Sequence, residues 1–256
     1  MVRNTSNAPE GTPTWLDLGI PDIERARRFY GGLFGWEFHD VGPEGGHYRL
    51  CLKDGQQVAG VIRNDEPDAD YWWQMYFATD DCDGTLKRVT DAGGTVVAPA
   101  DDVLEQGRMA VVKDPTGAQF GLWQGRAHIG SAIVNEHGSL LWNELHTARG
   151  EQAREFYRAV FGLQAEPVAE APGFVVLRRP DGRSIGGIQD DPRAARSTWV
   201  TYFAVDDVDA ALRAVRDGGG SQVSEPLDTP WGRWATVRDP FGTEFRVMTP
   251  APEPEG

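Results

Sequence analysis

The sequence predicts an α+β protein that contains one fold twice, and three observations support this prediction. The segment ARRFY at residues 26–30 recurs as AREFY at residues 153–157, which lie 127 positions later. The segment YFA at residues 76–78 recurs at residues 202–204. Each half also carries two amphipathic helical stretches among short alternating strands. Repeats of this length are typical of a duplicated domain.

The first copy opens with a strand at residues 14–20 and a helix that Asp22 caps. Apolar residues then recur at the spacing of one helical face, and Gly35 ends the helix. The residues of this face are Ile23, Ala26, Phe29, Tyr30 and Leu33. We therefore expect this helix to lie on a buried core.

Short strands at residues 47–52 and 58–62 follow, with a turn at Asp54 between them. A strand at residues 71–79 then leads into a second helix, which stops at Gly93. Three more strands complete the first copy. Each copy thus reads as strand, helix and three strands, twice over.

The second copy repeats this order, with helices near residues 151–160 and 208–216. Two βαβββ modules per copy imply a mixed, strongly curved sheet with its helices on the convex side. The concave side is then free to hold a ligand. We expect the function to lie in pockets that the two copies build together.

These patterns place the first domain at residues 13–124 and the second at residues 139–249. Residues 125–138 show no clear period and are interpreted as the interdomain linker. The tail at residues 250–256 is rich in Pro and Glu, and we expect it to be disordered.

The bulk composition limits the partners. The net charge is −14, which argues against nucleic acid and anionic membranes, because both attract basic patches. Cys51 and Cys82 both lie in the first half, so a disulfide framework is not expected. No secretory leader or long apolar run is visible, so we expect a cytoplasmic protein, as a monomer or a homodimer.

Three motifs occur in both copies, in the same order. They are FYxxLFG at 29–35 with FYxxVFG at 156–162, FxxDD at 77–81 and 203–207, and DPxG at 114–117 and 239–242. With these motifs, the chain resembles the vicinal oxygen chelate superfamily over residues 13–249. That superfamily includes glyoxalase I, extradiol dioxygenases and the fosfomycin and bleomycin resistance proteins. The resemblance implies a tandem pair of such domains, but the fold hosts unrelated chemistries.

The resemblance also implies one divalent metal per site, held by His and Glu side chains. The corresponding positions are Trp15, Gln74 and Gly121 in the first copy and Trp142, Val200 and Arg246 in the second. None is a His, Asp, Glu or Cys, and an arginine repels a cation. We therefore expect no metal and no cofactor. The alternative is a metal bound through Asp17, Glu144 or His146, which share the concave face.

Strand alternation predicts the residues that face the two concave sides. The candidate ligand-binding residues are Trp15, Gln74, Tyr76, Gln119 and Trp123 in the first copy and Trp142, Tyr202, Trp231 and Arg246 in the second. The candidate catalytic residues are Asp17, Glu144 and His146. Paired aromatic walls favour a flat, partly apolar, aromatic small molecule.

Each of these residues also has a purely structural interpretation. Aromatic residues on a curved sheet are often core, and Asp17 or Glu144 could pair with an arginine such as Arg246 to hold the domains together. His146 has no titratable counterpart, because Gly19 stands at that place in the first copy. This asymmetry suggests that only one concave side is active, or that the two bind different ligands. Asp114 and Asp239 are interpreted as turn residues without chemistry.

Three functions remain open at this point. The first is a metal-independent enzyme that tailors a natural product by acid–base chemistry, through cyclisation, dehydration, ketal formation or isomerisation. Its carboxylates would have raised pKa values near the buried tryptophans. The alternative is a protein that sequesters a drug or metabolite, as bleomycin resistance proteins do. A metal-dependent lyase or dioxygenase is the least favoured, because of the residues at the ligand positions.

Overall fold

A computed structural model describes residues 3–66 and 70–252 of the chain. The first half contains β1 (Pro13–Ile20), α1 (Ile23–Phe34), β2 (Glu37–Asp40), β3 (Arg49–Lys53), β4 (Gln56–Arg63), β5 (Gln74–Ala78), α2 (Cys82–Asp91), β6 (Thr95–Val103), β7 (Gly107–Lys113) and β8 (Gln119–Gly125). A short 3-10 turn, Pro43–Gly45, lies between β2 and β3.

The second half contains β9 (Leu140–Thr147), α3 (Gly150–Phe161), β10 (Gln164–Pro167), β11 (Phe174–Arg178), β12 (Ser184–Asp190), β13 (Thr198–Ala204), α4 (Val208–Asp217), β14 (Ser221–Gln222), β15 (Leu227–Thr229), β16 (Gly232–Arg238) and β17 (Glu244–Pro250). Among the described residues, no helix is both long and apolar enough to cross a membrane.

Each half forms its own curved, mixed sheet, which confirms the predicted fold class. Sheet 1 has the strand order β2-β3-β4-β1-β5-β8-β7-β6, and sheet 2 has β10-β11-β12-β9-β13-β17-β16-β14 with β15 beside β16. In sheet 1, β1 runs parallel to β4 and antiparallel to β5, and β9 repeats this in sheet 2 with β12 and β13. The two βαβββ modules of each domain therefore meet at a central antiparallel pair.

The predicted local signals set the helix ends. Asp22 caps α1 by accepting a hydrogen bond from the Arg25 N–H at 2.9 Å, and Asp81 and Asp207 cap α2 and α4 in the same way. Gly35 ends α1 with a φ of 72°, a left-handed conformation that favours glycine. Helix α3, whose N-cap residue is Arg149, begins without a side-chain cap.

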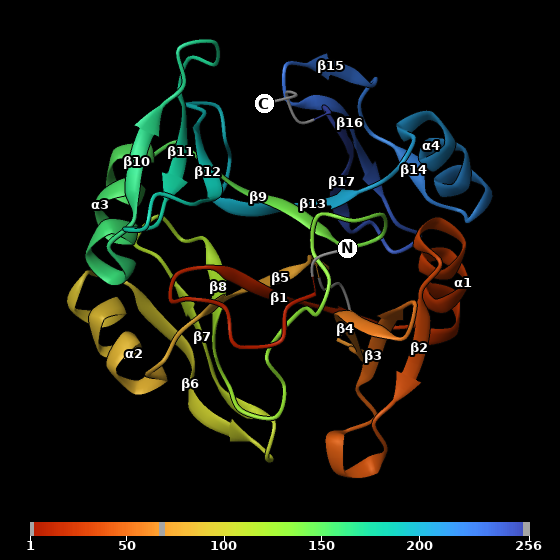
Figure 1. Cartoon of the computed structure of the whole chain (residues 1–256), viewed down its shortest axis with the longest axis horizontal. Coiled ribbons are helices and arrows are strands. Elements are labelled where there is room, and N and C mark those ends of the chain that lie inside the picture. Colours follow the sequence, from red (N-terminus) through yellow and green to blue (C-terminus); the bar gives the residue numbers. More distant parts are fainter. Residues whose placement is uncertain (1–2, 67–69, 253–256) are drawn as a thin grey trace.

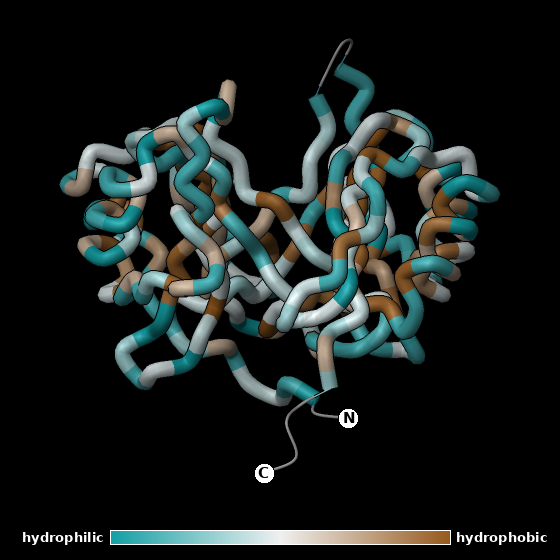
Figure 2. The backbone as a smooth tube through the Cα atoms, turned by 90° about the horizontal axis from the view of Figure 1, so that it is seen from above, coloured by the Kyte–Doolittle hydropathy of each residue, from teal (hydrophilic) through white to brown (hydrophobic). Residues whose placement is uncertain are grey.

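The two sheets lie back to back, with α1 and α4 on one side of the molecule and α2 and α3 on the other (Figure 1). Hydrophobic residues gather on the central strands and on the inner sides of the helices, while hydrophilic residues cover the outer sides (Figure 2). The contact between the domains is therefore a filled apolar core.

Each domain buries aromatic residues of its first helix against the other domain. On α1, Phe34 lies 5.0 Å from Phe203 of sheet 2, measured between ring centroids. On α3, Phe161 lies 4.9 Å from Phe77 of sheet 1. The expected pockets between the copies are thus a wrong prediction, because side chains fill this space. Each concave face is instead built within one sheet.

A tyrosine from each first helix also bonds to a buried turn aspartate of the other domain. Tyr30 donates to Asp239 Oδ2 at 2.8 Å, and Tyr157 donates to Asp114 Oδ2 at 3.0 Å. Both aspartates are at most 3 % exposed, and their other oxygens accept backbone N–H groups of their own turns. The DPxG turns are therefore fixed by the partner domain as well as by local geometry.

Among the boundaries that differ from the predicted ones are the start of β5 and the end of β17. The strand expected at residues 71–79 begins only at Gln74, because Trp73 is 2 % exposed and packs among Tyr30 and Trp36 of the interdomain core. Pro250, placed in the disordered tail, still pairs with Gly232 at the end of β17. Residues 253–256 of that tail lie outside the described residues.

We expect Tyr30→Phe to lower the free energy of unfolding by about 1–3 kcal/mol, because a buried carboxylate oxygen of Asp239 loses its partner. Urea denaturation measures this loss. Tyr71→Phe is the matched control, since its hydroxyl makes no hydrogen bond to a described residue. Equal stability of the two variants would show that the Tyr30–Asp239 bond contributes nothing.

Candidate functional site

The concave face of sheet 1, here called cup 1, is filled by its own aromatic residues. Trp15, Tyr76 and Trp123 form a buried cluster and are 3–6 % exposed. Tyr48, just before β3, and Met109 on β7 pack against this cluster. Cup 1 therefore brings together the three predicted aromatic residues of the first copy, but they contact one another and leave little open surface.

Asp17 lies at the bottom of cup 1 and accepts hydrogen bonds from its neighbours. Trp15 Nε1 donates to Asp17 Oδ1 at 2.9 Å, and the Tyr48 hydroxyl donates to the same oxygen. Burial raises the pKa of Asp17, and the hydrogen bonds from Tyr48, Tyr76 and Trp15 oppose this only in part. This is the direction that the sequence predicts for a carboxylate beside tryptophan.

Two glycines make room for the rings of cup 1. A Cβ atom at Gly60 would lie 1.6 Å from the Tyr48 hydroxyl, and one at Gly121 would lie 2.0 Å from a ring carbon of Tyr76. Gly121 is one of the positions where the resemblance implies a metal ligand. In this chain that position is occupied by the Tyr76 ring.

The linker closes cup 1 with a histidine. The His128 ring lies 4.2 Å from Trp15 and 5.4 Å from Trp123, measured between centroids. Trp123 Nε1 donates to the His128 carbonyl at 2.9 Å. Burial lowers the pKa of His128 to about 4, so the imidazole is neutral at neutral pH.

The concave face of sheet 2, here called cup 2, holds a polar cluster instead. Glu144 Oε2 accepts a hydrogen bond from the Tyr202 hydroxyl at 2.6 Å and pairs with Arg246 Nη1 at 2.8 Å. His146 Nε2 lies 3.2 Å from the same oxygen. The Arg246 guanidinium also lies over the Trp234 ring, 4.3 Å from its centroid. Cup 2 therefore gathers both predicted catalytic residues of the second copy around one oxygen.

The pKa of Glu144 is lowered, whereas the sequence predicts a raised pKa for a carboxylate near buried tryptophans. Burial alone would raise its pKa, but the hydrogen bond from His146 and the charge of Arg246 outweigh burial and lower it. Glu144 is therefore ionised at neutral pH and acts as an acceptor. Burial and the nearby carboxylate raise the pKa of the Tyr202 phenol, which keeps its proton.

The two domains do not share these charges. Arg246 pairs with Glu144 of its own domain, while Asp17 is held by Tyr48 in cup 1. An Asp17–Arg246 contact between the domains, considered above, is therefore not formed. The predicted ion pair between Glu144 and an arginine does form, but both residues belong to cup 2, so it does not join the domains.

The remaining predicted residues lie around these clusters. Gln119 Nε2 donates to Gln74 Oε1 at 2.8 Å, at the start of β8 and β5 in sheet 1. Trp142 lies two residues before Glu144 on β9 and is partly buried. Trp231 is half-exposed in the turn between β15 and β16. In Figure 1 this hairpin stands at the top of sheet 2, opposite β10–β12.

The residues present do not fit a resident divalent metal. Within residues 3–66 and 70–252, no group of three His, Cys, Asp or Glu side chains gathers. In cup 2, the Arg246 guanidinium is bound to the only carboxylate of the cluster, Glu144, so a cation there would face a fixed positive charge.

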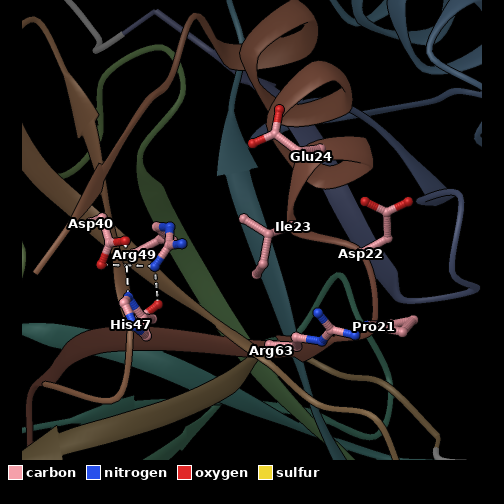
Figure 3. Close-up of a pocket in the computed structure, with 8 residues that line it drawn as sticks. All are labelled: Pro21, Asp22, Ile23, Glu24, Asp40, His47, Arg49 and Arg63. Carbon is pink, nitrogen blue, oxygen red and sulfur yellow. Dashed lines mark hydrogen bonds and ion pairs between the residues drawn. The ribbon is translucent and has the colours of Figure 1, made fainter. Parts of the chain in front are cut away.

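Two open hollows occur elsewhere on the surface, at equivalent places of the repeat. One, of about 730 Å³, lies at the start of α1, where Asp40 pairs with Arg49 at 2.9 Å (Figure 3). The other, of about 580 Å³, lies at the start of α3. Neither is lined by a predicted site residue, and the charged groups of Figure 3 are paired or face solvent. We therefore place the candidate site in cup 2.

Sequence comparisons agree with the fold. The profile of the Glyoxalase/Bleomycin resistance protein/Dioxygenase superfamily matches residues 13–122 and again 140–247. CFP32 of Mycobacterium tuberculosis (strain CDC 1551 / Oshkosh) is 40 % identical over 254 residues, covering 95 % of this chain and 97 % of that protein. The chain belongs to this superfamily.

Within the superfamily, the anthracycline biosynthesis protein DnrV of Streptomyces peucetius is 38 % identical over 255 residues, covering 93 % of each chain. Among solved structures, the Mn(II)-bound glyoxalase from Novosphingobium aromaticivorans has a TM-score of 0.67 at 15 % identity, covering 94 % of this chain and 82 % of that chain. CFP32 and DnrV both match this chain over almost their whole length. Members of this superfamily bind small molecules.

Sequence reasoning missed three residues of the two cups. Tyr48, which directly precedes β3 and packs with Leu50 against the cluster of cup 1, is not among the predicted residues. Trp234, which lies against Arg246 in cup 2, is not among the predicted residues. His128 lies in a segment without periodicity, so no local signal pointed to it.

The pH dependence of stability tests the placement of His128. Its folded pKa of about 4 lies below the ordinary 6.5, so its neutral form stabilises the fold fully above about pH 6.5 and this stabilisation is lost as the pH falls toward 4. We expect His128→Phe to reduce the stability lost between pH 7 and pH 5 by about 2 kcal/mol. Urea denaturation at both pH values measures this, with the exposed His39→Phe as control. Parallel profiles for His128→Phe and wild type would contradict the buried neutral imidazole.

Proposed function

We propose that cup 2 is the active site of a natural-product tailoring enzyme, which binds an aromatic small molecule and works by acid–base chemistry without a metal. The observation that carries this proposal is the cluster of Glu144, His146, Tyr202 and Arg246 on the concave face of sheet 2. The likeness to DnrV supports a role in natural-product biosynthesis.

Glu144 sets the chemical state of His146. An ionised carboxylate only accepts hydrogen bonds, so the Nε2 atom that faces Glu144 carries the proton. In that tautomer the lone pair is on Nδ1, which is the atom that can accept a proton. The carboxylate also stabilises the imidazolium that forms when Nδ1 accepts a proton.

The other two residues complete the acid–base set. Tyr202 keeps its phenolic proton and can donate it toward a developing negative charge. Arg246 holds both Glu144 and Tyr202 in place from β17. Proton removal by His146 and proton donation by Tyr202 suit a cyclisation, dehydration, ketal formation or isomerisation.

The walls of cup 2 indicate the ligand class. Trp142 and Trp234 are partly buried, Phe174 packs closely over Gly187, and Trp231 stands exposed at the hairpin tip. Apolar rings around a small polar cluster are typical of sites for planar, partly apolar ligands.

Turnover of hydroxylated polycyclic aromatic ketones, followed by mass spectrometry, tests the proposal. We expect Glu144→Gln to lower kcat about 100-fold, because the imidazole loses the carboxylate that orients it. Glu244→Gln, which removes an exposed partner of Arg238, is the matched control and should retain wild-type activity. Wild-type turnover by Glu144→Gln would rule out this catalytic role.

Turnover by the Asp17→Asn variant, compared with that of Glu144→Gln, tests which cup is active. Loss of turnover in Asp17→Asn but not in Glu144→Gln would move the site to cup 1, where the pKa of Asp17 is raised.

Sequestration is the second candidate, and the Glu144–Arg246 ion pair favours it. A carboxylate whose pKa is lowered by its partners is a weak base and suits a rigid binding site. Quenching of tryptophan fluorescence by a ligand that is recovered unchanged would support this function over catalysis.

Metal removal separates the proposal from metal-dependent chemistry. We expect turnover to be unchanged, within about twofold, after treatment with a chelator, because Arg246 occupies the position of a metal ligand. Elemental analysis of the protein after incubation with iron, manganese, nickel and zinc is the second measurement. Activity that disappears with the chelator and returns with one of these ions would overturn metal independence.

A further inference from the structure

The guanidinium of Arg246 is held on one side only. Both of its hydrogen bonds, to Glu144 and to the Tyr202 hydroxyl, are made through Nη1. Nε is buried without a hydrogen-bond partner among the described residues, and Nη2 has no partner there either. A buried donor without a partner is destabilising, so an acceptor at this edge would be stabilising.

This edge belongs to a side chain that is fixed in place. The guanidinium lies 4.3 Å from the centroid of Trp234 and 4.9 Å from that of Tyr202, and the side chain is 14 % exposed. Contact with these two rings leaves the planar fork little freedom to turn. A fixed fork of two N–H donors matches a negatively charged oxygen.

We propose that cup 2 binds its ligand as an anion, through an acidic phenolic or enolic oxygen that pairs with the free edge of Arg246. In this arrangement the guanidinium serves as the cation of the site, in place of a metal. The inference rests on the proposed function, because it assumes that the aromatic ligand enters cup 2.

The ligand proton has a nearby acceptor. The O–H bond of the ligand breaks, its electron pair stays on the oxygen beside Arg246, and the proton forms a new N–H bond with His146. The charged groups of the loaded cup are then Arg246, protonated His146, Glu144 and the ligand oxygen, so they sum to zero. The raised pKa of Tyr202 keeps that phenol neutral.

Cup 1 shows the contrast within the same chain. The position equivalent to Arg246 is Gly121, which is covered by Tyr76, and Gly19 stands where His146 stands in cup 2. Neither the cation nor the proton acceptor of cup 2 has a counterpart there. The inference therefore concerns cup 2 alone.

The probe for this inference is 1,2-dihydroxyanthraquinone, a planar phenol whose visible absorption shifts when it ionises. We expect the wild-type protein to lower the apparent pKa of the bound dye by about one unit, which is a tenfold preference for the ionised form. We also expect the dimethyl ether of the dye, which cannot ionise, to bind about tenfold more weakly. Fluorescence quenching measures both affinities.

The variants are chosen to keep the buried charges balanced. The double variant Glu144→Gln/Arg246→Met removes both partners of the ion pair, and we expect it to abolish the shift in the dye. His146→Gln removes the proton acceptor and should reduce the shift. Arg238→Met, which breaks an exposed ion pair on β16, is the matched control and should keep the full shift.

Two results overturn the inference in different ways. If the dye and its ether bind equally and the dye does not ionise, cup 2 is an aromatic site without an anion preference, and the proposed function stands. If neither compound quenches fluorescence, the inference and the aromatic site fail together. A full shift retained in the double variant also excludes Arg246 as the cation.

Discussion

The rest of the molecule depends on the contact between the two convex faces, where each domain packs aromatic residues of its first helix against the other domain. Tyr30 reaches Asp239 and Tyr157 reaches Asp114, and the rings around them join both sheets into one core. Each buried aspartate in turn fixes the loop between two strands that carry cup residues. The concave faces can therefore differ from each other, because neither is needed to hold the domains together.

The difference between the cups depends on a few exchanged positions. Trp123 and Met109 of cup 1 correspond to Met248 and Trp234 of cup 2, so the indole moves from one strand to its neighbour. That move places a ring beside Arg246 in cup 2. In cup 1 the rings, together with His128, occupy the centre. The same fold thereby forms a buried aromatic face in one copy and a charged face in the other.

Local signals in the sequence were sufficient for the fold. The cap at Asp22, the left-handed Gly35 and the duplicated motifs each specify geometry within a few residues, and the structure agrees with them. The bond between Tyr30 and Asp239 joins residues 209 positions apart, so no local period reveals it. The sequence predicted which residues of the Glu144 cluster share a face, but not how they interact. Alternation placed its members on one face, but the sign of the Glu144 pKa shift depends on distances to His146 and Arg246 that alternation does not supply.

The symmetry of the convex faces has a consequence for a half-length chain. Such a chain would expose an aromatic surface that is complementary to a copy of itself, so two identical halves would associate into a homodimer with two equal cups. Joining the halves covalently raises the effective concentration of each for the other and favours the mixed pair. The linker therefore does more than connect the domains. It keeps two unlike halves together, so that aromatic side chains can fill the concave face of one half while the other half keeps a polar cluster.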